Sequence, residues 1–191
     1  MTENFQAMAT LAAAKMRPVF SATPLMRNAL LSERFDADIW LKREDLSPVR
    51  SYKLRGAFNA MRKVIPEKSL FVCASAGNHA QGVAYMCKHF GLNGVIFMPV
   101  TTPEQKIMKT KTFGGDLIEV RLTGDYFDDT LAAAQSYCAS VSGHFLSPFD
   151  DEDVIEGQAS VGVEIEAQLG VPDVIVMPVG GGGLASGVSS F

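Results

Sequence analysis

Lys53 is the residue of this chain whose type and position most directly favour chemistry. Ser51 precedes it as a good helix N-cap, and apolar residues recur after it at helical spacing, at positions 54, 57, 58, 61 and 65. The pattern predicts a helix with Lys53 in its first turn, where the positive end of the helix dipole disfavours the ammonium form. A lysine biased towards the neutral amine is a nucleophile that can form a Schiff base with a carbonyl. The alternative is a solvated lysine on an amphipathic helix.

A second polar motif, Ser-Ala-Gly-Asn-His, occupies residues 75–79. The apolar run before it, at 70–74, predicts a buried strand, and residues 83, 84, 87 and 90 predict the buried face of a helix that ends at Gly91. Ser75, Asn78 and His79 therefore stand at a helix N-terminus beside free backbone N–H groups, which suits a carboxylate. The alternative is an N-cap turn in which Ser75 and Asn78 satisfy only the local backbone.

Four consecutive glycines at 180–183 form the third motif. They follow an apolar run at 173–179, which predicts a buried strand, and they precede a helix start. Glycine lets the backbone approach an anion closely, so the motif predicts a phosphate site. Gly180, Gly182 and Ala185 also satisfy the loose dinucleotide pattern G-x-G-x-x-G/A, which is a weak signal alone, and the absence of G-K-[ST] argues against an ATP-binding P-loop.

The elements that must position these motifs alternate along the chain. An N-terminal helix, a helical stretch from Asn28 and a strand candidate at 37–43 come first. Helices are then predicted at 51–65, 78–90, 103–112, 126–141 and 151–169, and strands at 69–74, 94–98, 116–121 and 173–178. Such alternation predicts an α/β fold with a parallel sheet and right-handed crossovers. Both the 75–79 turn and the glycines would then lie at carboxyl ends of strands, where ligands gather.

Composition narrows the possible functions. The chain has 191 residues, 47% hydrophobic and 20% charged, with a net charge of −4 and scattered basic residues, so we expect a globular protein that binds no nucleic acid. Its three cysteines show no ligand spacing, and the acidic cluster at 150–153 fits a helix N-terminus better than a metal site, so no metal is expected. We find no membrane span in the sequence and expect a cytoplasmic location.

Taken together, the three motifs resemble the fold-type II family of pyridoxal-phosphate enzymes, which is tryptophan synthase beta-like, and most closely its threonine and serine dehydratases. The matching stretches lie at 41–45, 49–57, 74–84, 113–115, 157–158 and 178–185. The resemblance implies an N-terminal arm of a large domain at 1–49, a complete small α/β domain at 50–147 and the start of the main part of the large domain at 148–191. Because the chain ends where such a catalytic domain is little more than half complete, we expect the N-terminal portion of a longer enzyme.

The resemblance also implies a role for each motif. Lys53 would bind pyridoxal 5'-phosphate covalently and, once displaced by substrate, remove the Cα proton. Asn78 would hold the ring hydroxyl of the cofactor, while Ser75, Asn78 and His79 would receive the substrate carboxylate. The phosphate would be bound by the backbone of Gly180, Gly181, Gly182, Gly183 and Leu184.

The reaction implied is the dehydration and deamination of L-threonine to 2-oxobutanoate and ammonia, or of L-serine to pyruvate and ammonia. It would serve isoleucine biosynthesis or threonine catabolism, in an enzyme that self-associates when full length. By the same resemblance, Tyr52 would wall the ring pocket, whereas the charged run at 42–45, which could also be a solvated face, is interpreted as structural.

Three alternatives stay open. A sister reaction, racemisation or β-replacement, is possible on the same fold, but serine racemases of the family tend to carry a serine where this chain has Ala76, and a methyl group cannot transfer a proton. A non-catalytic remnant that binds cofactor without turnover is the second alternative. A Rossmann oxidoreductase is the third, and it leaves Lys53 and the motif around Asn78 unexplained.

Overall fold

The structure of the chain, a computed structural model, describes residues 3–65 and 67–191. Its elements in chain order are α1 (Glu3–Met16), β1 (Leu25–Arg27), α2 (Ala29–Phe35), β2 (Trp40–Lys42), η1 (Glu44–Leu46), α3 (Lys53–Val64), β3 (Leu70–Ala74), α4 (Asn78–Phe90), β4 (Asn93–Met98), α5 (Glu104–Gly114), η2 (Gly115–Leu117), β5 (Ile118–Leu122), α6 (Phe127–Ser140), β6 (His144–Phe145), α7 (Glu152–Leu169) and α8 (Gly183–Ser190). The predicted alternation of helices and strands is confirmed from α3 to α7.

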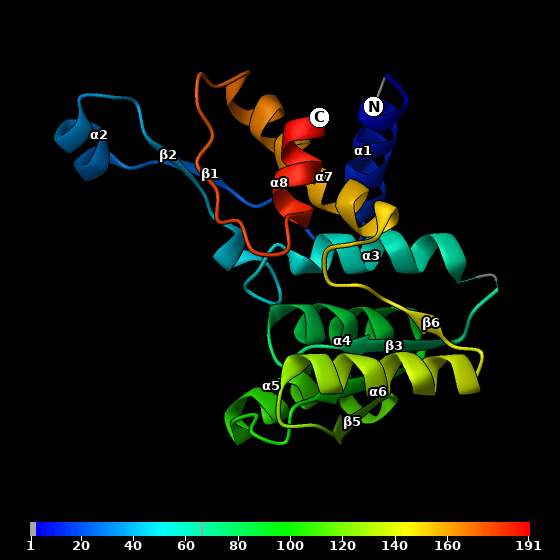
Figure 1. The fold of residues 1–191 in the computed structure, drawn as a ribbon. Helices are drawn as coiled ribbons and strands as arrows, with labels where there is room; N and C mark the ends of the chain where they lie inside the picture. The colour runs from blue at the N-terminus through cyan, green and yellow to red at the C-terminus, as the bar shows by residue number, and fades with distance from the viewer. Residues whose placement is uncertain (1–2, 66) are drawn as a thin grey trace.

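A four-stranded parallel sheet in the order β5-β4-β3-β6 forms the lower half of the molecule (Figure 1). Successive side chains of a strand point to opposite faces of a sheet, and here both faces are covered. Phe71, Cys73 and Ile96 pack against α4, whereas Val72 and Phe97 pack against α6. This double cover explains why the strands read as continuous apolar runs rather than alternating ones.

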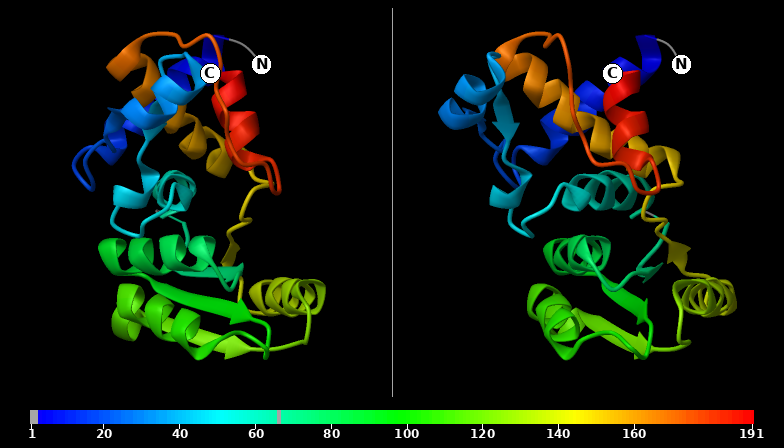
Figure 2. Two further views of the ribbon diagram at one scale, coloured as in Figure 1. Left: turned by 90° about the vertical axis from the view of Figure 1, so that its left-hand side faces the viewer. Right: turned by 60° about the vertical axis from the view of Figure 1, so that its left-hand side comes forward.

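Helix α3 lies between this sheet unit and the helices α1, α7 and α8 above it (Figures 1 and 2). Its approach to α7 requires glycine on both sides, because a Cβ at Gly157 would lie 2.6 Å from the carbonyl oxygen of Arg55 and 2.7 Å from the Cα of Gly56. Its other side packs against α4, and residues of α1, α3, α4 and the sheet form one continuous core. Both faces of α3 are therefore buried.

The predicted strand at 173–178 is wrong for this chain. The segment has no regular secondary structure, and Val174 and Val176 are 75% and 93% exposed. A strand needs a neighbouring backbone to accept and donate its hydrogen bonds, and no strand of the described residues pairs with this segment. The apolar composition of the segment is strand-like, but no strand among the described residues pairs with it and buries it.

The region before α3 differs from the sequence prediction in detail. The strand candidate at 37–43 shortens to β2, which pairs antiparallel with an unpredicted β1, and α2 projects from the body between them (Figure 2). The two-residue strand β6 was also missed, since it is too short to show a period. The expected division into 1–49, 50–147 and 148–191 stays a prediction.

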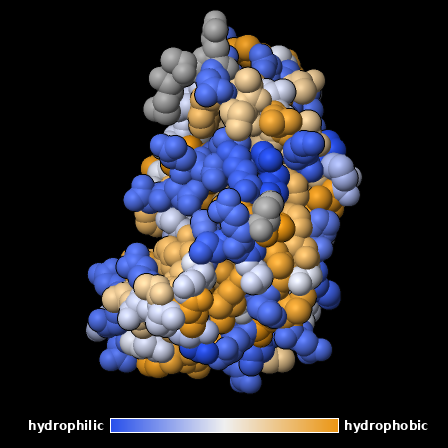
Figure 3. Space-filling model, turned by 90° about the vertical axis from the view of Figure 1, so that its right-hand side faces the viewer, coloured by the Kyte–Doolittle hydropathy of each residue, from blue (hydrophilic) through white to orange (hydrophobic). Residues whose placement is uncertain are grey.

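Hydrophilic side chains form a band across the face that carries the C-terminal end of α3 (Figure 3). At this end Lys63 pairs with Asp153 and Glu156 of α7, and Asp151 caps α7 by accepting a hydrogen bond from the N–H of Val154 at 3.0 Å. The acidic cluster thus serves a helix N-terminus, as predicted. No helix within residues 3–65 and 67–191 combines the length and apolar character needed to cross a membrane.

Candidate active site

Lys53 opens α3, as the sequence predicts. Its backbone N–H donates to the Oγ of Ser51 at 3.1 Å, but the N-cap residue is Tyr52, whose side chain makes no capping hydrogen bond, so the prediction of Ser51 as the N-cap is wrong by one residue. The side chain is half-buried, and this burial lowers the pKa of the Lys53 amine below that of an ordinary lysine. The direction agrees with the prediction, but the cause is burial rather than the helix dipole. Its Nζ donates to the carbonyl oxygen of Pro148 at 2.5 Å and lies 5.4 Å from the centre of the Tyr52 ring.

Helix α4 fixes the backbone of Lys53 from below. A Cβ at Gly82 would lie 3.2 Å from the carbonyl carbon and oxygen of Lys53 and 3.2 Å from the nitrogen of Leu54. Real Cβ atoms seldom come this close to backbone atoms, so glycine at position 82 allows α4 to rest directly on the first turn of α3. The lysine motif and the motif at 75–79 are thereby packed together.

The 75–79 motif connects β3 to α4 at the carboxyl end of the sheet. The N–H of Ser75 donates to the carbonyl of Phe97 at 3.0 Å, and its Oγ accepts from the N–H of Gly77 at 3.2 Å. Asn78 opens α4 and is exposed. The first N–H groups of a helix have no intrahelical acceptor, so this turn offers donors to an anion. Ser75 thus satisfies the local backbone, as the alternative held, while its hydroxyl hydrogen can still be donated.

The His79 side chain is not presented to this turn. It is 2% exposed, and its Nε2 is 3.0 Å from the carbonyl oxygen of Leu146. A carbonyl can only accept, so Nε2 carries the hydrogen, and burial lowers the pKa of His79 to about 4, which keeps the ring neutral. The expected contact of His79 with a substrate carboxylate stays a prediction, and only its backbone N–H lies in the open first turn of α4.

The glycines at 180–183 lead into α8, which begins at Gly183, one residue before the start predicted directly after the glycines. Gly182 has a φ of +89°, a backbone conformation that favours glycine, and a Cβ at Gly181 would lie 2.2 Å from the ring of Phe149. Gly183 is similarly close to the Phe149 backbone, at 3.0 Å. The four residues of the loop itself carry no side chain that could cover its N–H groups, and the Phe149 ring packs against one side of it.

Residues 146–149, here called the junction, bring the three motifs together between β6 and α7. Leu146 accepts from His79, Pro148 accepts from Lys53, and Phe149 contacts Gly181 and Gly183. The lysine and glycine motifs also meet in an apolar cluster that includes Tyr52 and Leu184. Sequence reasoning missed the junction, because a main-chain acceptor has no residue signature and an isolated phenylalanine has no period.

A buried ion network was also missed. Arg55 is 1% exposed and pairs with Glu44 and Glu164, and Lys42 pairs with the same Glu164 at 2.6 Å. Burial alone would raise the pKa of Glu164, but hydrogen bonds from Arg55 and Lys42 outweigh it and lower that pKa to about 2. The structural interpretation of the run at 42–45 is supported for Lys42 and Glu44, whereas Arg43 forms its own ion pair with Asp45 nearer the surface.

A family model described as "Pyridoxal-phosphate dependent enzyme" matches residues 16–191. The chain belongs to this family. Its curated relatives include the L-threonine dehydratase biosynthetic IlvA of Bacillus subtilis, which is 50% identical over 179 residues that make up 92% of this chain and 42% of the relative. The chain therefore spans less than half the length of that relative.

Solved structures with the same fold include the processed form of threonine deaminase isoform 2 from Solanum lycopersicum. Its TM-score with this chain is 0.91, at 38% identity. The match covers all of this chain and 53% of the tomato protein. Maize serine racemase shows a TM-score of 0.88 and 26% identity over 95% of this chain and 55% of the racemase. These similarities confirm the fold-type II assignment.

The residues present fit the cofactor of the family, pyridoxal phosphate, which carries an aldehyde and a phosphate. Lys53 offers a half-buried amine whose lowered pKa favours attack on an aldehyde. The loop at 180–183 offers backbone N–H groups at a helix N-terminus from residues that carry no side chain of their own. The junction holds both groups, since Pro148 contacts the first and Phe149 the second.

Proposed function

We propose that this chain is the N-terminal portion of an enzyme that deaminates L-threonine, and also L-serine, by dehydration. The products are 2-oxobutanoate or pyruvate, with ammonia. The names of the most similar curated relatives support threonine as substrate, and the word biosynthetic in those names favours a role in isoleucine formation over threonine catabolism. Because the chain spans only 42% of the first of these relatives, the activity of the whole enzyme belongs to this proposal.

The observation that carries the proposal is the position of Lys53. Pyridoxal phosphate, when bound, withdraws electrons from the Cα of an amino acid and makes its proton acidic. Lys53 would attach the cofactor and then take that proton, a role that burial favours because it lowers the pKa of the Lys53 amine. No other lysine in the described residues opens a helix beside the glycine loop.

The remaining residues bind and orient. Asn78 donates its side-chain amide to the ring hydroxyl of the cofactor, and the Ser75 hydroxyl with the N–H groups of Asn78 and His79 binds the substrate carboxylate. The phosphate is held by the backbone N–H groups of five consecutive residues. These are Gly180, Gly181, Gly182, Gly183 and Leu184.

Dehydration is favoured over racemisation by Ala76. This residue follows Ser75 in the same turn, is half-buried and packs against the core, and its methyl group can neither donate nor accept a proton. The maize neighbour is named a serine racemase, so the comparison of folds alone does not separate the two reactions. Product analysis with L-serine separates them, because dehydration yields pyruvate and racemisation yields D-serine.

The domain division, the cytoplasmic location and the self-association of the full-length enzyme belong to the same proposal. The sheet β5-β4-β3-β6 lies wholly within residues 70–145, which supports a small domain at 50–147. The relatives named as biosynthetic amino-acid enzymes support a cytoplasmic location.

Covalent attachment of the cofactor tests the proposal. The 191-residue chain is incubated with pyridoxal phosphate, reduced with borohydride and digested, and the labelled lysines are identified by mass spectrometry. We expect label at Lys53 in the wild type and in Lys88→Ala, whose lysine is exposed on α4, and loss of the dominant label in Lys53→Ala. Label spread evenly over exposed lysines would contradict the proposal.

Turnover is measured on intact, unreduced portions of the same protein preparations by adding L-threonine or L-serine and following the 2-oxo acid. Formation of 2-oxobutanoate that depends on Lys53 supports a working dehydratase. Label at Lys53 without any product would identify this chain, taken alone, as a binding piece without turnover.

A further inference from the structure

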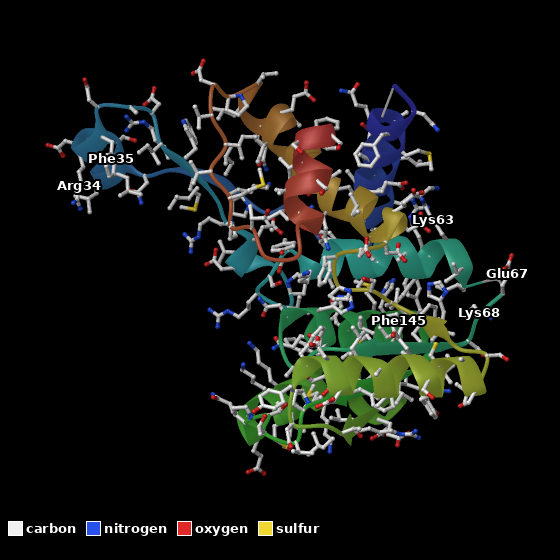
Figure 4. The ribbon with its side chains drawn as sticks, viewed as in Figure 1. Arg34, Phe35, Lys63, Glu67, Lys68 and Phe145 are labelled. Carbon is white, nitrogen blue, oxygen red and sulfur yellow. The ribbon has the colours of Figure 1, made fainter. Side chains whose placement is uncertain are left out.

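We propose that the junction at 146–149 is a positioning element that holds Lys53 and the glycine loop in register, with His79 and Phe149 as its positioning residues. This inference rests on the proposed function, because it concerns how the cofactor site is assembled. The junction is short and lies between β6 and α7, so it enters the site from outside all three sequence motifs. Figure 4 labels Phe145, the residue of β6 that leads into it.

The first contact anchors the junction to α4. Leu146 is fully buried, its N–H donates to the carbonyl of Val72 at 2.8 Å, and its carbonyl accepts from Nε2 of His79 at 3.0 Å. His79 is buried and neutral, and its Nδ1 has no partner among the described residues. The neutral imidazole therefore donates its one N–H to the junction. This hydrogen bond fixes the main chain at Leu146, just before Pro148.

The second contact transmits this position to the lysine. The carbonyl of Pro148 accepts from Nζ of Lys53, while Gly82 brings α4 against the Lys53 backbone. His79 and Gly82 are three residues apart on α4, so they lie on the same side of that helix. One helix thus packs against the backbone of Lys53 and also holds Leu146, two residues before the Pro148 carbonyl that accepts from the Lys53 amine.

The third contact places the glycine loop. The Phe149 ring occupies the space that a side chain at Gly181 would need, and the Phe149 backbone lies against Gly183. Lys53 and the glycine loop are therefore held by adjacent residues of one segment, Pro148 and Phe149. A shift of the junction would move the amine and the phosphate donors relative to each other.

Two aldehydes distinguish these contacts, because pyridoxal lacks the phosphate of pyridoxal phosphate. The rate of borohydride-trapped attachment to Lys53 is measured with each aldehyde, with Lys88 as an internal reference, and circular dichroism confirms folding. The phosphate advantage is the ratio of the two rates. It reports on the glycine loop, whereas the rate with pyridoxal reports on the placement of the amine.

Phe149→Ala should reduce the phosphate advantage by about 10-fold or more, since a misplacement of about 1 Å in a binding group costs that much or more. Phe145→Ala is the matched control, because Phe145 is also half-buried but packs on the α6 side of the sheet, and it should keep the wild-type ratio. Phe149→Leu retains apolar volume and should lie between Phe149→Ala and the wild type, so it tests the same contact if Phe149→Ala does not fold.

His79→Leu should slow attachment of both aldehydes to Lys53 by about 10-fold while leaving their ratio unchanged. His79→Gln should restore the rate, because a glutamine amide can place an N–H where Nε2 lies. A merely structural histidine would lower stability without changing the preference for Lys53 over Lys88, and glutamine would not rescue it.

An unchanged phosphate advantage in folded Phe149→Ala or Phe149→Leu, or an unchanged Lys53 rate in His79→Leu, would overturn the inference. A wild-type chain with no preference for Lys53 would instead overturn the proposed function and the inference together. The two failures are thus distinguished by the wild type alone.

Discussion

At the scale of single residues, the site depends on burial more than on formal charge. Lys53 and His79 both have a lowered pKa, and in both the main cause is the cost of burying the charged form. His79 is neutral at physiological pH and acts as a hydrogen-bond donor. The pKa of the Lys53 amine is lowered by burial rather than by a neighbouring cation.

The pH dependence of attachment follows from the lowered pKa of Lys53. An exposed lysine has a pKa of about 10.4 and loses its neutral amine as the pH falls below that value. Lys53 should keep a larger neutral fraction at pH 8, so its preference over Lys88 in trapping with pyridoxal should increase as the pH falls from 10 to 8. A preference that stays constant over this range would contradict the assignment.

Glu164 tests the buried ion network. In Glu164→Gln the buried Arg55 and Lys42 lose a charged partner, and breaking a buried pair in this way costs about 3 kcal/mol of unfolding free energy. Urea denaturation measures the loss, and Asp45→Asn, which breaks a more exposed pair, should have little effect. Because the pKa of Glu164 is lower in the folded than in the unfolded protein, its ionised carboxylate stabilises the fold at pH values above the pKa of the unfolded state. This stabilisation is lost as the pH falls towards 2, so the difference in unfolding free energy between wild type and Glu164→Gln should narrow in acid.

At the scale of elements, the crossing of α3 and α7 determines where Lys53 stands relative to the junction. Gly157 of α7 lies directly against the backbone of Arg55 and Gly56, and the ion network joins the same two helices through Arg55 and Glu164. Lys53 is two residues from Arg55. The network and the glycine contact therefore place the start of α3 without touching the reacting groups.

Gly157→Ala should separate these helices. The added methyl would meet backbone atoms at 2.6–2.7 Å, which cannot rotate away, so we expect a loss of about 2 kcal/mol in unfolding free energy. Gly162→Ala on the same helix is the control, because its methyl would meet only the Phe191 side chain at 3.1 Å. Equal stability of the two variants in urea denaturation would show that the close crossing is not required.

The elements also show what a sequence can and cannot specify. The bounds of α4 were predicted correctly because strand, turn and helix signals agree at 70–91, and the start of α8 followed from the glycines. The segment 173–178 failed because strand formation depends on a partner that local pattern cannot supply. Phe149 and Pro148 were missed because their roles depend on contacts with residues 32 and 95 positions away.

At the scale of the whole molecule, an exposed apolar segment at 171–179 contrasts with the closed core. Val171, Val174 and Val176 are each at least 75% exposed, and their backbone is unpaired by any described strand. A strand-like segment with free backbone groups invites pairing with another chain. We therefore expect concentration-dependent association of the isolated 191-residue chain.

Val176→Ser should reduce this association without lowering stability, because the side chain is 93% exposed and contributes little to the core. Light scattering over a concentration series measures the first effect and the thermal midpoint the second. Leu30→Ser on the projecting α2, 75% exposed but helical, is the control and should leave association unchanged. Association that responds equally to both variants would assign it to exposed apolar area in general.

Burial of α3 on both faces has a consequence for how the molecule comes apart. The sheet unit and the helices α1 and α7 share one hydrophobic core through α3. Neither part can therefore separate from α3 without exposing core side chains of the other part to water. Unfolding should then be a single cooperative event, and the slowest amide exchange should lie in α3 and β3 rather than at the periphery. The helix that presents the lysine would be the last part of the protein to lose its structure.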